Sequence, residues 1–263
     1  MKLPILTAVI LLGAGAARAG AVGSSGTWAA NDPFVGKWTL NVPRSTIVDQ
    51  MAVEATGPNR FTFRFEGGPA ETVLADGTDQ PGVPGTTLAV SVRDSRTLTI
   101  VRKQSGRVVV SASWKISEDG RILHDAFTAA QPNRPAITTN YVYRRMSGNS
   151  GFSGTWESTT RPLGLIVELR IQPYGGRGLS FVSQGFVKNV TFDGKDHAVG
   201  GVANGTVASG RRRSERAMEY TEKNGGKVID TRKLALSSDD KTLTIHVDKA
   251  GQATPTVLVF ARE

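Results

Sequence analysis

The stretch Phe34-Val35-Gly36-Lys37-Trp38 occurs twice in the chain, and its second copy decides how the fold is interpreted. That copy is Phe152-Ser153-Gly154-Thr155-Trp156, 118 residues later, with Phe, Gly and Trp at the same positions. Later segments also recur: Asp76-Gly77-Thr78-Asp79 returns in similar form after 117 residues, and Ser117-Glu118-Asp119-Gly120 after 120 residues. Offsets this constant indicate a duplicated domain rather than a solenoid of short units.

Between the repeated segments, short runs rich in Val, Ile, Thr, Phe and Tyr alternate with Gly, Asp and Asn. Strand-like runs spaced by about 8 to 12 residues are typical of antiparallel sandwiches and barrels. No window has a helical period. We therefore predict an all-β protein of two tandem small antiparallel up-and-down β-barrels with little helix. The alternative is that both repeats contribute to a single larger or open sheet.

The first residues have the pattern of an export signal. Lys2 supplies a positive charge, Leu6 to Leu12 is an apolar run, and Ala17-Arg18-Ala19 is a small-x-small cleavage site. We expect the protein to be exported to the periplasm or the cell exterior, and no later segment is apolar enough to span a membrane. The predicted parts are a signal peptide (1–19), a disordered lead-in (20–31), a first barrel repeat (32–146), a flexible linker (147–150) and a second barrel repeat (151–263).

Composition excludes several kinds of chemistry. The chain contains no cysteine, so it has no disulfide scaffold, no thiol nucleophile and no thiolate metal site. Its formal net charge is +9, and removal of Lys2 and Arg18 with the signal leaves about +7. A basic exported protein is drawn to anionic surfaces and small anions, so weak contact with the cell envelope is expected. Nucleic acid is not an expected partner in that compartment.

Gly-x-Trp at the first strand of each repeat, a run of antiparallel hairpins and an Arg in the last strand resemble the lipocalin-like (calycin) β-barrels. That resemblance implies a Trp packed across the barrel floor beneath an Arg of the final strand, pairing Trp38 with Arg145 and Trp156 with Arg262. The end of each repeat also resembles secreted bacterial proteins of unknown function. The segments that carry this likeness are Phe192 to Asp196, Lys223 to Val228 and Ser238 to Thr244. It implies a fold and a compartment but no catalytic residues.

No motif for catalysis, cofactor binding or metal binding is present. The chain lacks a Gly-x-Ser-x-Gly elbow and a phosphate-binding loop. Its three histidines share no spacing, and most acidic residues fall in turns, where they usually bind the local backbone. We therefore predict no catalytic residues, no metal and no cofactor.

Two features of the second repeat differ from the first. Asp230 and Arg232 replace Val110 and Ala112 at positions whose alternation faces the core. Buried charges are costly unless they pair with each other or with a bound molecule. The second repeat also contains Arg211-Arg212-Arg213, which we expect at the rim of the second barrel. A register shift, a simple ion pair or a solvated hairpin would explain these features without a ligand.

These residues predict a non-catalytic protein that binds a small anionic or amphipathic molecule in the second barrel. The candidate ligand-binding residues are Arg232, Asp230, Tyr220, Met218, Arg211, Arg212 and Arg213. One alternative is an envelope interaction protein with filled barrels. The other is an enzyme that uses the barrel mouth, for which the sequence supplies no recognisable set of residues. The sequence leaves the oligomeric state open.

Overall fold

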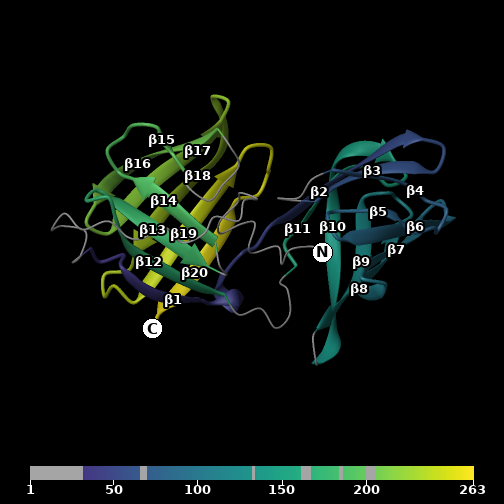
Figure 1. The fold of residues 1–263 in the computed structure, drawn as a ribbon, viewed down its shortest axis with the longest axis horizontal. Helices are drawn as coiled ribbons and strands as arrows, with labels where there is room; N and C mark the ends of the chain where they lie inside the picture. Colours follow the sequence, from purple (N-terminus) through teal and green to yellow (C-terminus); the bar gives the residue numbers. More distant parts are fainter. Residues whose placement is uncertain (1–31, 66–69, 132–133, 161–166, 184–185, 200–204) are drawn as a thin grey trace. The chain divides into compact units, whose positions relative to one another are not determined.

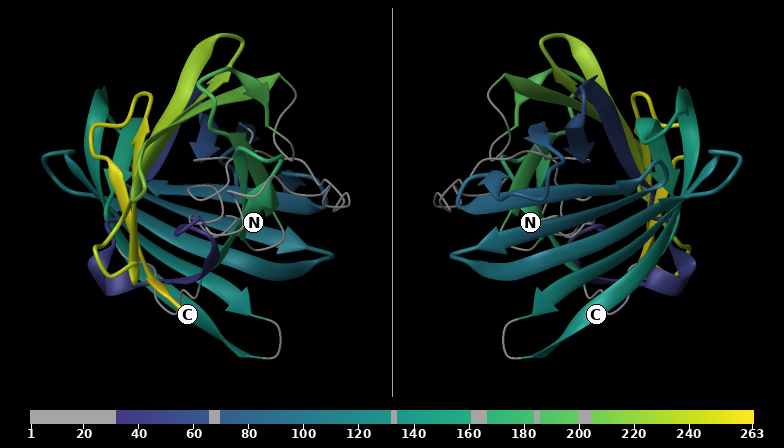
Figure 2. Two further views of the ribbon diagram at one scale, coloured as in Figure 1. Left: turned by 90° about the vertical axis from the view of Figure 1, so that its left-hand side faces the viewer. Right: turned by 90° about the vertical axis from the view of Figure 1, so that its right-hand side faces the viewer.

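The computed structural model describes residues 32–65, 70–131, 134–160, 167–183, 186–199 and 205–263. Its chain divides into two compact units, one within residues 48–164 and the other within residues up to 47 and from 165 onward. Each unit contains one antiparallel ten-stranded sheet that curves until its two edges approach each other (Figures 1 and 2). The predicted all-β fold with two barrel-shaped antiparallel sheets is confirmed. The predicted signal peptide and lead-in lie outside the described residues.

The first unit has the strand order β4-β3-β2-β11-β10-β9-β8-β7-β6-β5. Alternate residues face its interior, as on β8, where Val110, Ala112 and Trp114 are buried. Its strands are β2 (Asp49–Gly57), β3 (Arg60–Phe65), β4 (Glu71–Leu74), β5 (Gln80–Pro81), β6 (Thr86–Asp94), β7 (Thr97–Gln104), β8 (Arg107–Ile116), β9 (Ile122–Gln131), β10 (Arg134–Ser150) and β11 (Ser153–Ser158).

The second unit has the equivalent order β14-β13-β12-β1-β20-β19-β18-β17-β16-β15. The only helix in the described residues is the short 3-10 turn η1 (Val42–Arg44) after β1. The strands of this unit are β1 (Gly36–Leu40), β12 (Glu168–Tyr174), β13 (Gly178–Ser183), β14 (Phe186–Thr191), β15 (His197–Ala198), β16 (Thr206–Ser214), β17 (Ala217–Asn224), β18 (Lys227–Leu236), β19 (Thr242–Lys249) and β20 (Thr256–Arg262).

The two repeats exchange their first strands. Strand β1, from the first repeat, lies between β12 and β20 of the second unit, where Figure 1 shows it in purple. Strand β11, from the second repeat, lies between β2 and β10 of the first unit. Each unit therefore contains nine strands of one repeat and the Gly-x-Trp strand of the other.

A short connection explains the exchange. Strand β10 ends at Ser150 and β11 begins at Ser153, so only Gly151 and Phe152 lie between them. A connection of two residues places consecutive strands side by side as a hairpin. Strand β11 is thereby fixed against β10, and β1 occupies the equivalent place beside β20 in the second unit.

Three predictions of the sequence need correction for this reason. Residues 147–150 are not a flexible linker but the end of β10. The boundaries 32–146 and 151–263 describe the sequence repeats, whereas the compact units divide near residues 47 and 164. The predicted Trp–Arg partners are wrong: Arg145 lies over Trp156, with its Cζ 4.0 Å from the ring centroid, and Arg262 lies over Trp38 at 4.1 Å.

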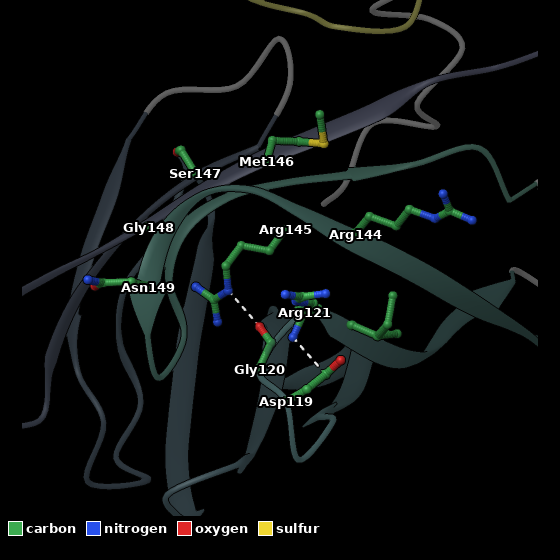
Figure 3. Close-up of a pocket in the computed structure, with 10 residues that line it drawn as sticks. Asp119, Gly120, Arg121, Arg144, Arg145, Met146, Ser147, Gly148 and Asn149 are labelled. Carbon is green, nitrogen blue, oxygen red and sulfur yellow. Dashed lines mark hydrogen bonds between the residues drawn. The ribbon is translucent and has the colours of Figure 1, made fainter.

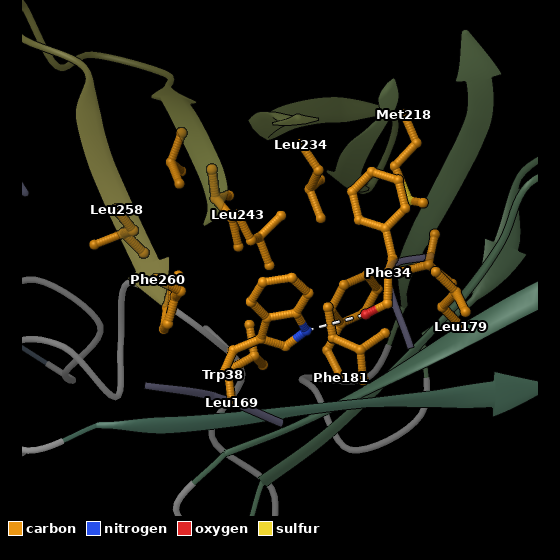
Figure 4. Close-up of a cluster of buried hydrophobic side chains, with 14 of the residues drawn as sticks. Phe34, Trp38, Leu169, Leu179, Phe181, Met218, Leu234, Leu243, Leu258 and Phe260 are labelled. Carbon is orange, nitrogen blue, oxygen red and sulfur yellow. Dashed lines mark hydrogen bonds between the residues drawn. The ribbon is translucent and has the colours of Figure 1, made fainter. Parts of the chain in front are cut away.

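These Trp–Arg pairs close one end of each unit, which we call the closed end. The indole Nε1 of Trp38 donates a hydrogen bond to the Phe34 carbonyl at 3.0 Å, and apolar side chains of the surrounding strands pack around both residues (Figure 4). The Arg262 guanidinium donates to the backbone carbonyls of Pro33, Val35 and Asp240. The pairs therefore have a structural role at the closed end, because the guanidinium N–H groups donate to backbone carbonyls.

At the seam of each unit, where the two edges of the sheet meet, the contact is brief. In the first unit the Gly77 N–H donates to the Val90 carbonyl at 2.8 Å. In the second, the Gly194 N–H donates to the Gly210 carbonyl, also at 2.8 Å. The seam is therefore held by few backbone hydrogen bonds, and side chains that cross it gain importance. Within the described residues, no helix is long and apolar enough to cross a membrane.

Candidate functional site

Asp230 and Arg232 lie inside the second unit, as their alternation predicts. They are two residues apart on β18 and so share its inward face, with 0% and 2% of their surface exposed. The Arg232 Nη2 lies 3.0 Å from the Asp230 Oδ2, and Nε lies 3.3 Å from Oδ1. The pair is therefore a two-point ion pair in the interior of the barrel.

A second ion pair, which sequence reasoning missed, lies beside the first. Lys188 on β14 donates to Glu222 on β17, and both side chains are almost fully buried. The same Glu222 carboxylate is 4.0 Å from the Arg232 Nη2, so the two pairs are in electrostatic contact. The sequence did contain a signal for this pair: Lys188 is two residues from Val190, a core residue on the same strand, and alternation places both on the inward face.

Lys249 adds a fifth charge to this cluster. It stands directly opposite Asp230 in the β18–β19 ladder and therefore on the same face, with its Nζ shielded from solvent. Three basic and two acidic side chains thus face this part of the interior, which leaves one net positive charge. We call Lys188, Glu222, Asp230, Arg232 and Lys249 the charged cluster.

Tyr220 and Met218, two other candidates, also face the interior. The Tyr220 ring centroid lies 5.7 Å from the Arg232 Cζ, within cation–π range, and 5.8 Å from the Phe181 centroid. Burial raises the pKa of the Tyr220 hydroxyl, so it stays protonated at neutral pH. Met218, the next inward-facing residue of β17, lies closer to the closed end, among the apolar side chains around Trp38 (Figure 4). The interior is thus charged at one level and apolar at the next.

The charged cluster shifts the pKa of its members in opposite directions. Burial, assisted by the nearby Arg232 charge, lowers the pKa of Lys188 to about 8, although Glu222 and Asp230 act against the shift. Burial also acts to lower the pKa of Arg232, but Asp230, Tyr220 and Glu222 outweigh it and raise that pKa. Lys188 therefore gives up its proton more readily than Arg232.

The three arginines 211–213 do not form a rim around the charged cluster. Arg212 reaches the closed end, where it donates to Asp32 and lies 5.6 Å from the Phe34 ring centroid. Arg213 pairs with Glu219 on the next strand. Arg211 lines a pocket of about 480 Å³ that also includes Glu219 and Lys223. The prediction that these arginines act together with Arg232 is not supported by their positions.

Comparison with the first unit separates what folding needs from what is particular to the second. Asp230, Arg232 and Lys249 correspond through the 120-residue offset to Val110, Ala112 and Ala129. The first unit therefore forms the same sheet with small apolar residues at these three positions. The charges at positions 230, 232 and 249 are not a requirement of the barrel.

The other ion pair does have a counterpart, with its charges reversed. Glu71 on β4 and Arg102 on β7 occupy the positions of Lys188 and Glu222. Two hydrogen bonds of 2.9 and 2.5 Å join their side chains, which are both about 6% exposed. Each pair connects a strand near one side of the seam to a strand near the other. Both units therefore have a buried ion pair across the seam, but the acidic and basic residues exchange places between the two units.

Buried polar side chains also gather in the first unit, where the Tyr143 hydroxyl donates to the Asp49 carboxylate and Asp125 is 1% exposed. In the described parts of the chain, no group of three or more His, Cys, Asp or Glu side chains is arranged to hold a metal ion. The fold defines a duplicated barrel protein, and Asp230, Arg232 and Lys249 distinguish the interior of the second unit from that of the first. Comparisons with protein-family models, with curated proteins and with solved structures found no match for the chain.

Proposed function

We propose that the protein is an exported, non-catalytic binding protein that holds a small anionic or amphipathic molecule in the second unit. The observation that carries this proposal is the charged cluster, which faces the barrel interior with one net positive charge. Small antiparallel barrels of this kind have room for side chains or one small ligand. The basic side chains of the cluster would attract an anionic group, and the adjoining apolar side chains would contact an apolar part of the molecule.

The energetics support a role other than folding. Removing charges from water costs several kcal/mol per ion, and well-packed apolar residues in their place are often equally or more stabilising. The first unit has apolar residues at three of the five positions and still forms its barrel. The charged residues at positions 230, 232 and 249 are therefore better explained by binding of a ligand than by a contribution to folding stability.

The lipocalin-like class and export belong to the same proposal. The class is supported by the curved antiparallel sheet, the Gly-x-Trp strand and the Trp–Arg closure of each unit. Export is supported by the sequence pattern of the first residues. Lipocalin-like barrels bind small molecules in their interior, in agreement with the charged cluster as the site.

The test exchanges the residues of one repeat for those of the other. In the full chain, Asp230→Val, Arg232→Ala and Lys249→Ala are made together, which gives the second unit the residues of the first. The probe is 8-anilinonaphthalene-1-sulfonate, an amphipathic anion, followed by fluorescence and displaced by dodecanoate. We expect saturable binding to the wild type and a loss of about tenfold or more in affinity in the triple variant.

Melting curves of both proteins show whether the triple variant is folded. The matched control is Arg93→Ala, which removes an exposed charge from the first unit. Equal probe affinity in wild type and triple variant, or no saturable binding at all, would overturn the proposal. The second outcome favours the alternative of an envelope interaction protein with filled barrels, for which the internal pairing of Asp230 with Arg232 is the supporting observation.

A further inference from the structure

A basic surface lies in the first unit, outside the site described above. A pocket of about 540 Å³ opens at its closed end, between the turn before β9 and the last part of β10 (Figure 3). This volume is in the usual range for small-molecule sites. Three arginines and a single carboxylate line it: Arg121, Arg144, Arg145 and Asp119.

Two of these four side chains are already committed to the fold. The Arg145 guanidinium donates hydrogen bonds of 2.6 Å to the carbonyls of Gly120, Gly151 and Ser153. The Asp119 carboxylate accepts from the Ser117 hydroxyl and from the Arg121 backbone N–H. Asp119 therefore stabilises its turn, and Arg145 closes the barrel over Trp156.

The guanidinium groups of Arg121 and Arg144 make no such hydrogen bonds to the fold among the described residues. Both are exposed, and in the described part of the chain neither guanidinium forms an ion pair. Figure 3 shows Arg145 turned toward Gly120, whereas the side chain of Arg144 extends away from that contact. The Arg144 charge therefore remains available to a ligand in the pocket, and the Arg121 charge is shared with the nearby Asp119 carboxylate.

The second unit shows that the fold does not need the charge of Arg144. It retains the same turn, in which Asp239 accepts from Ser237 and the Lys241 N–H, and the same closure by Arg262. The positions of Arg144 and Met146 are taken there by Ala261 and Glu263. Lys241 takes the position of Arg121, so it is the positive charge of Arg144 that is particular to the first unit.

We propose that Arg121 and Arg144 form a binding site for a phosphate monoester group in the pocket at the closed end of the first unit. Guanidinium groups bind such oxyanions through paired, charge-assisted hydrogen bonds. A phosphate monoester carries about −1.5 to −2 charges at neutral pH, which matches two arginines better than a carboxylate or a sulfate ester does. The pocket is larger than a phosphate ion, and Met146, 45% exposed at its edge, provides an apolar contact for the rest of the molecule.

The experiment uses the full chain and two probes that share the phosphate chemistry. Phenyl phosphate, titrated by calorimetry, represents a soluble ester. Vesicles of phosphatidic acid in phosphatidylcholine, tested by sedimentation, represent a lipid headgroup. The variant Arg144→Ala installs the residue that the second repeat has at this position, so its fold should be preserved. Arg93→Ala is the matched control for the loss of one exposed positive charge.

We expect Arg144→Ala, and Arg121→Lys with Arg144→Ala, to weaken binding by about tenfold or more, whereas Arg93→Ala changes it less than twofold. Added salt should weaken the interaction because the site is exposed. Dependence on Arg144 for phenyl phosphate alone identifies a soluble ester, and dependence for vesicles alone identifies a lipid. Binding of neither probe, or equal binding by wild type and Arg144→Ala, overturns the proposal.

Discussion

The guanidinium of Arg145 lies over the indole of Trp156, a residue that belongs to the other sequence repeat, with 4.0 Å between Cζ and the ring centroid. The two residues are also directly opposite in the β10–β11 ladder. The same relationship joins Arg262 to Trp38 across β20 and β1. The closed end of each unit is therefore made by an Arg of one repeat and a Trp of the other. Damage to one repeat at its Trp should appear in the unit formed mainly by the other.

Trp156→Ala is expected to destabilise the first unit by about 3–5 kcal/mol, because it removes a fully buried ring and leaves a cavity. The second unit should remain folded. Fluorine NMR of 5-fluorotryptophan protein in urea can follow the units separately, since Trp114 reports on the first and Trp38 on the second. In the matched variant Trp38→Ala, the Trp114 signal of the first unit should be lost at the same urea concentration as in wild type. Loss of the Trp38 signal at lower urea in Trp156→Ala would contradict the strand exchange.

The sequence identified the Trp and Arg residues that form the closed ends but not which Trp pairs with which Arg. Gly-x-Trp and the final Arg occur in both repeats with nearly the same spacing, so local sequence cannot distinguish Arg145 from Arg262 as the partner of Trp156. What decides is the two-residue connection between Ser150 and Ser153, which only the strand boundaries reveal. The signal was weak because glycine, serine and asparagine there also suit a flexible linker.

The charged cluster was predictable only in part, for a similar reason. Strand alternation placed Asp230 and Arg232 inside, because both lie on a long, regular strand. Lys188 lies on β14, a shorter edge strand that pairs with the adjacent β13, and its ion pair with Glu222 crosses the seam. Alternation gives the face of a residue but not which distant strand lies across the barrel. Contacts across the seam therefore required the structure.

Reversing the buried ion pair of the first unit tests the seam directly. Arg102→Glu alone, or Glu71→Lys alone, should destabilise that unit by about 3–5 kcal/mol, because each leaves like charges buried together. The double variant reproduces the polarity of Lys188 and Glu222 and should regain about 2 kcal/mol or more. Recovery should be incomplete, since the Glu71 carboxylate also accepts from the Val83 N–H.

The Trp114 signal in urea measures this cycle. A coupling energy within about 0.5 kcal/mol of zero would mean that the two side chains act independently and that the ion pair does not hold the seam.

The stability of the second unit should rise with pH above about 8. Lys188 has a pKa of about 8 in the folded protein and 10.5 as its ordinary value, so between these values the unfolded chain binds more protons. Unfolding free energy then increases with pH, by at most about 1.4 kcal/mol per unit. Above pH 10 the raised pKa of Tyr220 acts in the opposite direction, because the folded state then holds the extra proton. The test is therefore confined to pH 8–10.

Urea unfolding followed through Trp38 at pH 8, 9 and 10 gives this slope. Lys188→Gln is the control, since it removes the titrating group and should remove the increase. An equal rise in the variant would assign the slope to other groups.

The glycine of the two Gly-x-Trp strands should differ in its tolerance of a side chain. Gly154 has a φ of +142°, and an added Cβ would lie 2.1 Å from the backbone oxygen of Ser147. Gly36 has a φ of +151°, but there the nearest atom is Nη1 of Arg262, 2.7 Å away at the end of a flexible side chain. Both substitutions strain the backbone by about 1–3 kcal/mol, but only Gly154→Ala must also displace a neighbouring strand.

We therefore expect Gly154→Ala to unfold the first unit at markedly lower urea than wild type, with the second unit unaffected. Gly36→Ala should lower the stability of the second unit by only about 1–3 kcal/mol, since Arg262 can move at the cost of its hydrogen bond to the Val35 carbonyl. The Trp114 and Trp38 signals report the two losses in the same titration. Equal losses of stability for the two alanine variants would mean that β10 and β11 can separate as easily as an arginine side chain can move. That result would contradict the tight hairpin that fixes the strand exchange.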